Sequence, residues 1–207
     1  MKKVVYLLVL SSIILLTGCG ETKVAITAKD VKDNEVILDS NNKVQTAIKE
    51  SFDKEYYSKE DLEKYIKDDV SAFNSNNGTK ISYNSMKVKD GQVYVVMDYS
   101  KVQDYNAYEE YNLTTAKGSG AKDCEYIPST LKVYGKDKNI SKSEALKESG
   151  VKVAVLSAKE NVEGASTKVE TNFTVAGKIK YVANAKKVDN NTVKVTSIKE
   201  PVVVIYK

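Results

Sequence analysis

The chain has 207 residues with 32 basic and 28 acidic side chains, and its formal net charge of +4 is too even a balance to favour binding to nucleic acid. It contains no histidine and no arginine, which excludes Ser-His-Asp and Cys-His catalysis, imidazole zinc sites and bidentate guanidinium recognition of carboxylate or phosphate. We therefore expect no catalytic residue, no metal site and no cofactor, and hydrolytic enzymes are strongly disfavoured.

The first 18 residues are typical of an export signal. Lys2 and Lys3 precede an uncharged run over residues 4–16, which is the charged start and apolar middle that signal peptides share. As a helix, these 13 residues reach only about 20 Å, against a hydrocarbon core of roughly 30 Å. The segment therefore predicts a cleaved leader rather than a membrane span.

The leader ends in an aliphatic residue and two small residues before a cysteine, Leu16-Thr17-Gly18-Cys19. This motif resembles the lipobox of bacterial lipoproteins. The resemblance covers residues 1–19 and implies cleavage before Cys19, attachment of diacylglycerol to its thiol, and a place on the extracytoplasmic face of the cell membrane. Two acyl chains, at about 0.8 kcal/mol per buried CH₂, hold a protein stably on a bilayer.

The lipidated cysteine and a polar tether are expected over residues 19–34, followed by two β-hairpins. The hairpins have turn residues that tolerate positive φ at Asn41-Asn42 and at Asp90-Gly91. The expected strand pairs are residues 35–39 with 43–52, and residues 80–88 with 92–99.

An amphipathic helix is predicted between the hairpins. Ser58 and Asp61 have the spacing of a capping box, and Gly78 ends the pattern. One stripe of the helix is apolar, namely Leu62, Tyr65, Ile66, Val70 and Phe73. The opposite face alternates Glu and Lys, which we interpret as a solvated surface rather than a catalytic or metal-binding carboxylate pair.

Residues 52–99 carry a second resemblance. The run Phe-Asp-Lys-Glu-Tyr-Tyr at residues 52–57, the helix with Leu62 and Ile66, and the Asp90-Gly91 turn are similar to stretches of uncharacterised lipoproteins of low-GC Gram-positive gut bacteria. This resemblance implies a Gram-positive cell surface. It implies no activity, because that family has no functional residues to carry over.

A second helix is predicted over residues 101–112, with Tyr105, Tyr108 and Tyr111 on one face. Two interpretations are open: an exposed platform that docks a protein or stacks on a sugar, or rings packed on the sheet with their hydroxyls at its rim. Packing is the favoured interpretation. These tyrosines are nevertheless the best candidates for an interaction surface that the sequence offers.

The middle of the chain offers two weaker signals, after a predicted loop over residues 114–123. Cys124 has no disulfide partner once Cys19 is lipidated, and we interpret it as an inert thiol. Asp137, Asn139, Ser141 and Glu148 match positions of a calcium loop, but Lys142 lies where that loop needs glycine. Because Ser141 and Glu144 also form a capping-box pattern, we predict a short helix here and no calcium site.

The last third of the chain is expected to be all β, with strands near residues 151–155, 168–175, 178–183, 188–192, 193–198 and 202–206. The predicted fold is therefore α+β: a mainly antiparallel sheet or sheets with two longer helices and one short helix. Residues 35–207 are assigned to a single domain, with residues 151–207 as a candidate C-terminal β lobe.

The function that these features favour is a non-enzymatic, membrane-anchored binding module whose partner is a cell-envelope protein or a glycan. One alternative is a small solute-binding lipoprotein, although the chain is short for two lobes and lacks their βαβ pattern. The other alternative is an enzyme that acts on glycans through two carboxylates about 5–9 Å apart.

Overall fold

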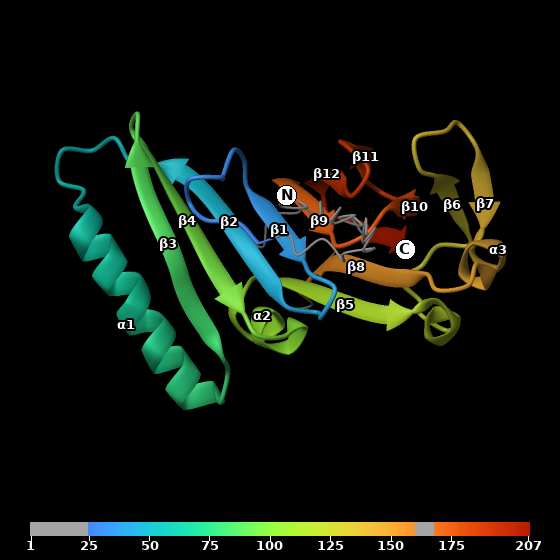
Figure 1. Ribbon diagram of the computed structural model, residues 1–207, viewed down its shortest axis with the longest axis horizontal. Helices are drawn as coiled ribbons and strands as arrows, with labels where there is room; N and C mark the ends of the chain where they lie inside the picture. Colours follow the sequence, from blue (N-terminus) through green and yellow to red (C-terminus); the bar gives the residue numbers. More distant parts are fainter. Residues whose placement is uncertain (1–24, 160–167) are drawn as a thin grey trace, which may run out of the picture.

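The computed structural model describes residues 25–159 and 168–207 (Figure 1). The predicted leader, the lipobox and Cys19 lie outside these residues. Among the helices in the described ranges, none is long and apolar enough to cross a membrane. The helices are α1 (Lys59–Asn77), α2 (Val102–Tyr108), α3 (Lys142–Lys147) and the 3-10 turn η1 (Gly118–Ala121).

The described residues form 13 strands in two sheets. The larger sheet has the order β11-β12-β9-β1-β2-β4-β3, and the smaller has the order β5-β8-β13-β10-β6-β7. The strands are β1 (Glu35–Leu38), β2 (Val44–Ser51), β3 (Ile81–Lys89), β4 (Gln92–Tyr99), β5 (Tyr111–Lys117), β6 (Thr130–Val133), β7 (Asn139–Ser141), β8 (Lys152–Ala158), β9 (Lys168–Val175), β10 (Ile179–Ala183), β11 (Lys186–Lys187), β12 (Thr192–Ser197) and β13 (Val202–Tyr206).

The predicted α+β class is therefore wrong, because the chain is mostly β. The second helix is the main cause of the error. It ends at Tyr108, and the next residue, Glu109, is already extended, with φ −82° and ψ 163°. The Asn106 side chain then accepts from the Leu113 amide at 2.7 Å and donates to the Leu113 carbonyl at 2.9 Å, which turns the chain into β5. The segment that we expected to be helix end and loop is thus a strand paired with β8.

The largest core lies between the two sheets. Strand β13 shows how it forms, because Val202, Val204 and Tyr206 belong to this core while Val203 and Ile205 belong to a second cluster beneath α3 and η1. This alternation has the period of two that a strand imposes. Strands from residues 151–207 occur in both sheets and pair with earlier strands, so they do not form a separate lobe.

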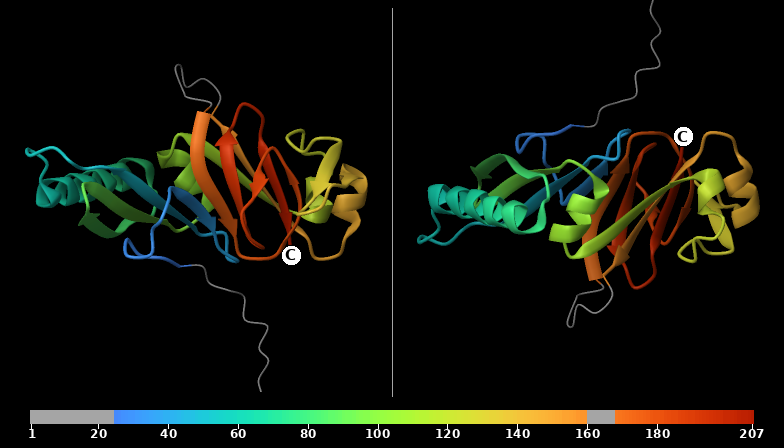
Figure 2. Two further views of the ribbon diagram at one scale, coloured as in Figure 1. Left: turned by 90° about the horizontal axis from the view of Figure 1, so that it is seen from above. Right: turned by 90° about the horizontal axis from the view of Figure 1, so that it is seen from below.

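The larger sheet extends beyond the smaller one. There β2, β4 and β3 carry α1 on one face, with α1 lying along β3 at one end of the molecule and α3 at the other (Figure 1). The views from above and below show the strands of both sheets between these two ends (Figure 2). One face of β2 and β4 is therefore covered by α1 and the short α2, rather than by a second sheet.

The opposite face of the same strands is covered by residues 25–34. Ala28 and Val31 are buried against Ala47 of β2 and Val96 of β4, and the Ala28 amide donates to the Ser85 hydroxyl at 2.8 Å. These ten residues, which we expected to belong to the tether, are part of the folded domain.

Candidate functional site

The apolar stripe of α1 is incompletely covered. The helix begins and ends as its sequence predicts, with the Ser58 hydroxyl accepting from the Asp61 amide at 3.1 Å and Gly78 at φ 64°. Of the stripe, however, only Val70 is buried, and the ring of Tyr65 is 67% exposed. An amphipathic helix normally buries its stripe against the core, so the first half of α1 leaves apolar surface available.

This surface is one wall of a groove of about 690 Å³. The floor is the face of β2 and β4, and its residues are Ile48, Val93, Val95 and Met97. The wall from α1 consists of Asp61, Leu62, Tyr65 and Ile66. These floor residues are apolar, whereas the wall adds a carboxylate and a tyrosine hydroxyl to its aliphatic side chains.

Aromatic side chains from the segment between β2 and α1 form one end of the groove. Phe52 and Tyr57 have ring centroids 4.9 Å apart, and Tyr56 and Tyr57 meet edge to face at 5.0 Å. The outermost ring, that of Tyr56, is 80% exposed. Three adjoining rings with one exposed to this degree are typical of a contact surface rather than of a core.

Tyr108 forms the other end and ties α2 to α1. Its ring meets Phe73 edge to face at 5.0 Å, and its hydroxyl donates to Asp69 Oδ2 at 2.7 Å. Burial and the neighbouring Asp69 carboxylate raise the pKa of the Tyr108 hydroxyl. The ring is therefore held as a fixed, neutral wall.

Glu109 is the one half-buried acid of the groove. The Tyr99 hydroxyl donates to its carboxylate, and Thr46 Oγ1 lies 3.4 Å from that hydroxyl. Burial raises the pKa of the Glu109 carboxyl, and this effect outweighs the opposing hydrogen bond from Tyr99 and the attraction of Lys159. The groove thus has a carboxyl group at its base, at the end where Tyr108 lies.

The remaining lining residues give the groove a negative character. Three carboxylates line it, those of Glu50, Asp61 and Glu109. None of its lining residues, all of which lie in the described ranges, is a lysine, although the chain carries 32 basic residues. The charge of the groove is therefore opposite to that of the chain as a whole.

The three tyrosines proposed from the sequence do not share one surface. Tyr105 is only 1% exposed and meets Tyr99 edge to face at 5.5 Å in the core. Tyr111 is half-buried and begins β5. Tyr108 alone lines the groove. The three rings do not lie on one helix face, because α2 ends at Tyr108 and Tyr111 belongs to a strand.

Sequence reasoning missed Phe52, Tyr56, Tyr57 and Tyr65 as site residues. One signal was available, since residues 52–57 hold three aromatic rings in an otherwise charged segment. Large rings in a polar connection have no core of their own to fill, and exposed aromatic clusters mark contact sites. Tyr65 was assigned to the buried stripe of α1, and only the position of the helix over β3 shows that it is exposed.

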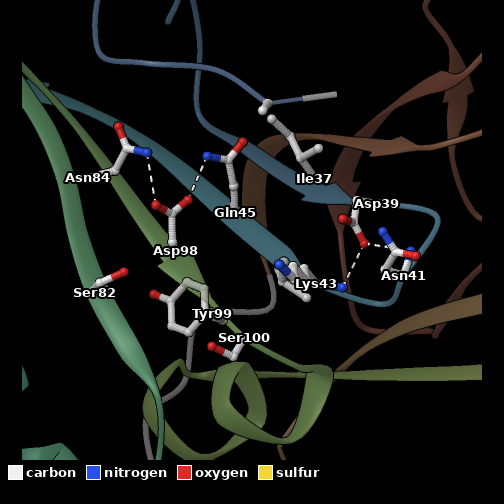
Figure 3. Close-up of a pocket in the computed structure, with 12 residues that line it drawn as sticks. Ile37, Asp39, Asn41, Lys43, Gln45, Ser82, Asn84, Asp98, Tyr99 and Ser100 are labelled. Carbon is white, nitrogen blue, oxygen red and sulfur yellow. Dashed lines mark hydrogen bonds between the residues drawn. The ribbon is translucent and has the colours of Figure 1, made fainter. Parts of the chain in front are cut away.

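A second hollow, of about 430 Å³, lies on the opposite face of the larger sheet (Figure 3). Asp98 is at its centre and accepts from Gln45 Nε2 at 2.6 Å and from Asn84 Nδ2 at 2.8 Å. Gln45 Oε1 in turn accepts from the Ile26 amide at 3.0 Å. These polar groups are satisfied by one another, and their evident task is to hold the N-terminal segment on the sheet.

The weaker sequence signals acquire ordinary structural roles. Cys124 is half-buried, without a disulfide partner among the described residues. Ser141 and Glu144 form the predicted capping box of α3, and Glu148 pairs with Lys180 at 3.2 Å and accepts from the Tyr181 hydroxyl at 3.1 Å. Within residues 25–159 and 168–207, no group of three or more His, Cys, Asp or Glu residues is arranged to hold a metal ion.

Comparison with known proteins does not assign the chain to a family. No family model matches the chain, no curated protein is significantly similar to it, and no solved structure matches its fold. The groove must therefore be interpreted from its own residues.

Proposed function

We propose that the protein is a non-enzymatic binding module held on the extracytoplasmic face of the cell membrane by a lipid on Cys19. In this proposal the groove between α1 and the face of β2 and β4 captures an exposed peptide segment of a cell-envelope protein. The observation that carries the proposal is the incompletely covered apolar surface of α1, bounded at both ends by aromatic rings. Helix faces and aromatic pockets of this kind recognise peptide side chains in many complexes.

The chemistry of the lining favours a peptide over a glycan. A sugar ring needs hydrogen-bond partners around its hydroxyls as well as a ring to stack on. The groove offers an apolar floor, and in the amide-rich hollow on the other face Asp98 is already hydrogen bonded to Gln45 and Asn84. A peptide with apolar side chains is the better match to such a floor.

The same lining supports binding rather than catalysis. Glycoside hydrolysis requires two carboxyl groups that flank the scissile bond. The half-buried carboxylate of the groove, Glu109, is engaged by the hydroxyl of the buried Tyr99. A fixed, neutral Tyr108 and a capped helix are features of a preformed contact surface.

The anchoring part of the proposal rests on the leader and the lipobox. The described part of the domain begins at residue 25, so the link from Cys19 to it spans at most about 20 Å. Cys19→Ser removes the thiol that accepts diacylglycerol. We expect fatty-acid labelling of wild type and none of the variant, with the variant retaining its leader. Equal labelling of both chains contradicts the anchor.

The binding part is tested by photo-crosslinking on intact cells. A photoreactive phenylalanine analogue replaces Tyr56 or Tyr65 at the groove, and Tyr126, which is 45% exposed and remote in sequence, serves as the matched control. The crosslinked peptide is identified by mass spectrometry, synthesised and titrated into the full-length protein and its Tyr65→Ala variant. We expect one envelope protein captured from both groove positions, with a peptide that Tyr65→Ala binds more weakly. Equal capture from Tyr126, or equal binding by the variant, overturns the proposal.

A further inference from the structure

We propose that the peptide captured by the groove is cationic and amphipathic, presenting apolar side chains to the floor and lysine or arginine to the acidic rim. This inference rests on the proposed function and specifies the partner of the same site. It follows from the juxtaposition of three carboxylates with exposed tyrosine rings in a cavity that no lysine lines.

Two of the three lysines of α1 are paired with acidic side chains of the same helix. Lys67 donates to Glu63 at 2.6 Å and lies over the Tyr83 ring of β3 at 5.0 Å, while Lys64 pairs with Asp68. The groove side of the helix carries Asp61 instead. The helix holds three lysines and five acidic residues, and the side that lines the cavity carries a carboxylate and no lysine.

Two of the rim carboxylates have no cationic partner within the part of the chain that the structure describes. Glu50 and Asp61 occur in none of its ion pairs, and both are exposed. Like charges that line one groove destabilise the free protein slightly, and a cationic ligand relieves this repulsion. The rim is therefore complementary to a positive segment.

The tyrosine rings add a second attraction for the same kind of ligand. An ammonium or guanidinium group over the face of an aromatic ring is stabilised by the ring quadrupole. Tyr56 and Tyr65 have exposed rings beside the carboxylates. The methylene stems of lysine and arginine also pack on apolar surface while their charged ends remain at the rim, which suits the floor of Val93, Val95 and Met97.

Glu109 extends this complementarity inward. Its carboxyl group is half-buried and accepts a hydrogen bond from the Tyr99 hydroxyl. A cation that reaches the base of the groove replaces the solvation that the carboxylate loses there. The rim carboxylates attract the peptide over a longer range, whereas Glu109 favours a long cationic side chain that enters the groove.

The test uses three fluorescent peptides of equal length that alternate leucine with lysine, with serine or with glutamate. They are titrated into the full-length protein in neutral detergent, with empty micelles as the blank. We expect the lysine peptide to bind about tenfold more tightly than the serine peptide and the glutamate peptide more weakly still. The advantage of the lysine peptide should be largely lost at about 0.5 M salt, where the Debye length is only a few ångströms.

Matched variants assign the effect to the groove. Glu50→Gln with Asp61→Asn removes two rim charges and should abolish most of the lysine preference. Glu125→Gln with Asp137→Asn makes the same change in net charge at exposed positions outside the groove and should leave the preference intact. A preference unchanged by the first pair, or lost equally with the second, overturns the inference.

The outcomes separate this inference from the function on which it rests. Equal binding of the three peptides overturns the charge preference and leaves an apolar peptide-binding groove. Binding of an N-acetylglucosamine oligomer with no binding of any peptide overturns both, because the occupant is then a glycan. Spermidine binding as tightly as the lysine peptide also overturns the inference, since the site is then selective for small amines.

Discussion

The two faces of strands β2 and β4 carry two hollows of opposite chemistry. On one face, Asp98, Gln45 and Asn84 form a polar hollow whose groups are joined by hydrogen bonds. On the other, Ile48 and Val95 lie at the floor of a groove with aromatic rings at its ends. The alternation of side chains along a strand places both within the same few residues.

The difference between the faces lies in what remains unsatisfied. In the polar hollow, the carboxylate oxygens of Asp98 already accept from Gln45 and from Asn84. The groove retains exposed rings, an incompletely covered helix and carboxylates without a cation. Surface that the fold leaves without a partner is therefore a better indicator of a binding site than the presence of a hollow.

The largest loss of stability is expected for a tyrosine that is buried in the core on the groove side of the sheet. Tyr105 is buried next to Tyr99, so Tyr105→Ala should lower the free energy of unfolding by about 3–5 kcal/mol. Tyr105→Phe keeps the ring and should lower it far less. Denaturant titration of both variants decides the matter, and equal stability of the alanine variant and wild type contradicts the assignment of Tyr105 to the core.

The polar face should respond to loss of its central acceptor. Asp98→Ala leaves the Gln45 and Asn84 amides without their carboxylate, which should cost about 1–3 kcal/mol. Hydrogen exchange should quicken at the Ile26 and Ala28 amides, which this network holds. Binding of peptides to the groove, measured at matched folded concentration, should be unchanged. Weaker peptide binding with intact folding shows that the two faces are coupled, against our comparison.

Local turn chemistry explains how much of the fold the sequence predicts. The hairpins at Asn42, with φ 60°, and at Asp90-Gly91, with φ 53° and 69°, are confirmed, as is the helix that ends at Gly78. Each of these signals lies within a few residues of the structure it specifies. The last strand, Val202–Tyr206, is also as predicted, since a continuous apolar run favours burial on both faces.

Long-range pairing explains what the sequence did not predict. Strand β5 includes Thr114 and Thr115 but leads into Gly118 and Gly120, and its partner β8 begins at Lys152. Similarly, β9 and β10 are separated by only three residues yet lie in different sheets, with β9 parallel to β1. No local pattern reports such a partner. The groove was missed for the same reason, because it depends on where α1 lies over β3.

A smaller effect is expected on the pH dependence of stability, and its direction is set by Glu109 in the groove. Its pKa is raised above the ordinary value of 4.5, mainly by burial. The folded chain therefore binds this proton more tightly than the unfolded chain, so the contribution to stability is present below about pH 4.5 and is lost as the pH rises through the folded pKa. Glu109→Gln lacks this dependence, so wild type should lose stability relative to the variant between about pH 4 and pH 7.

Two features of the surroundings make that measurement specific. Lys159 and Glu110 act on Glu109 in opposite directions and are present in both chains. Glu35, whose pKa burial also raises, is likewise common to both, so its titration cancels in the difference. A constant difference between wild type and variant across this pH range contradicts the raised pKa and weakens the role of Glu109 as a buried counter-charge.

The smallest expected change in stability is the sharpest test of the uncovered face. Tyr65 is mostly exposed on α1, and its hydroxyl has no hydrogen-bond partner among the described residues, so Tyr65→Ala should change the free energy of unfolding by less than about 0.5 kcal/mol. Peptide binding should nevertheless weaken, because the ring supplies contact area and attracts cations. Tyr65→Phe should retain most of the binding, since both contributions come from the ring. A loss of stability comparable to that of Tyr105→Ala means that α1 is packed as core over its whole length. The groove is then closed in solution, and the contrast between the two faces disappears.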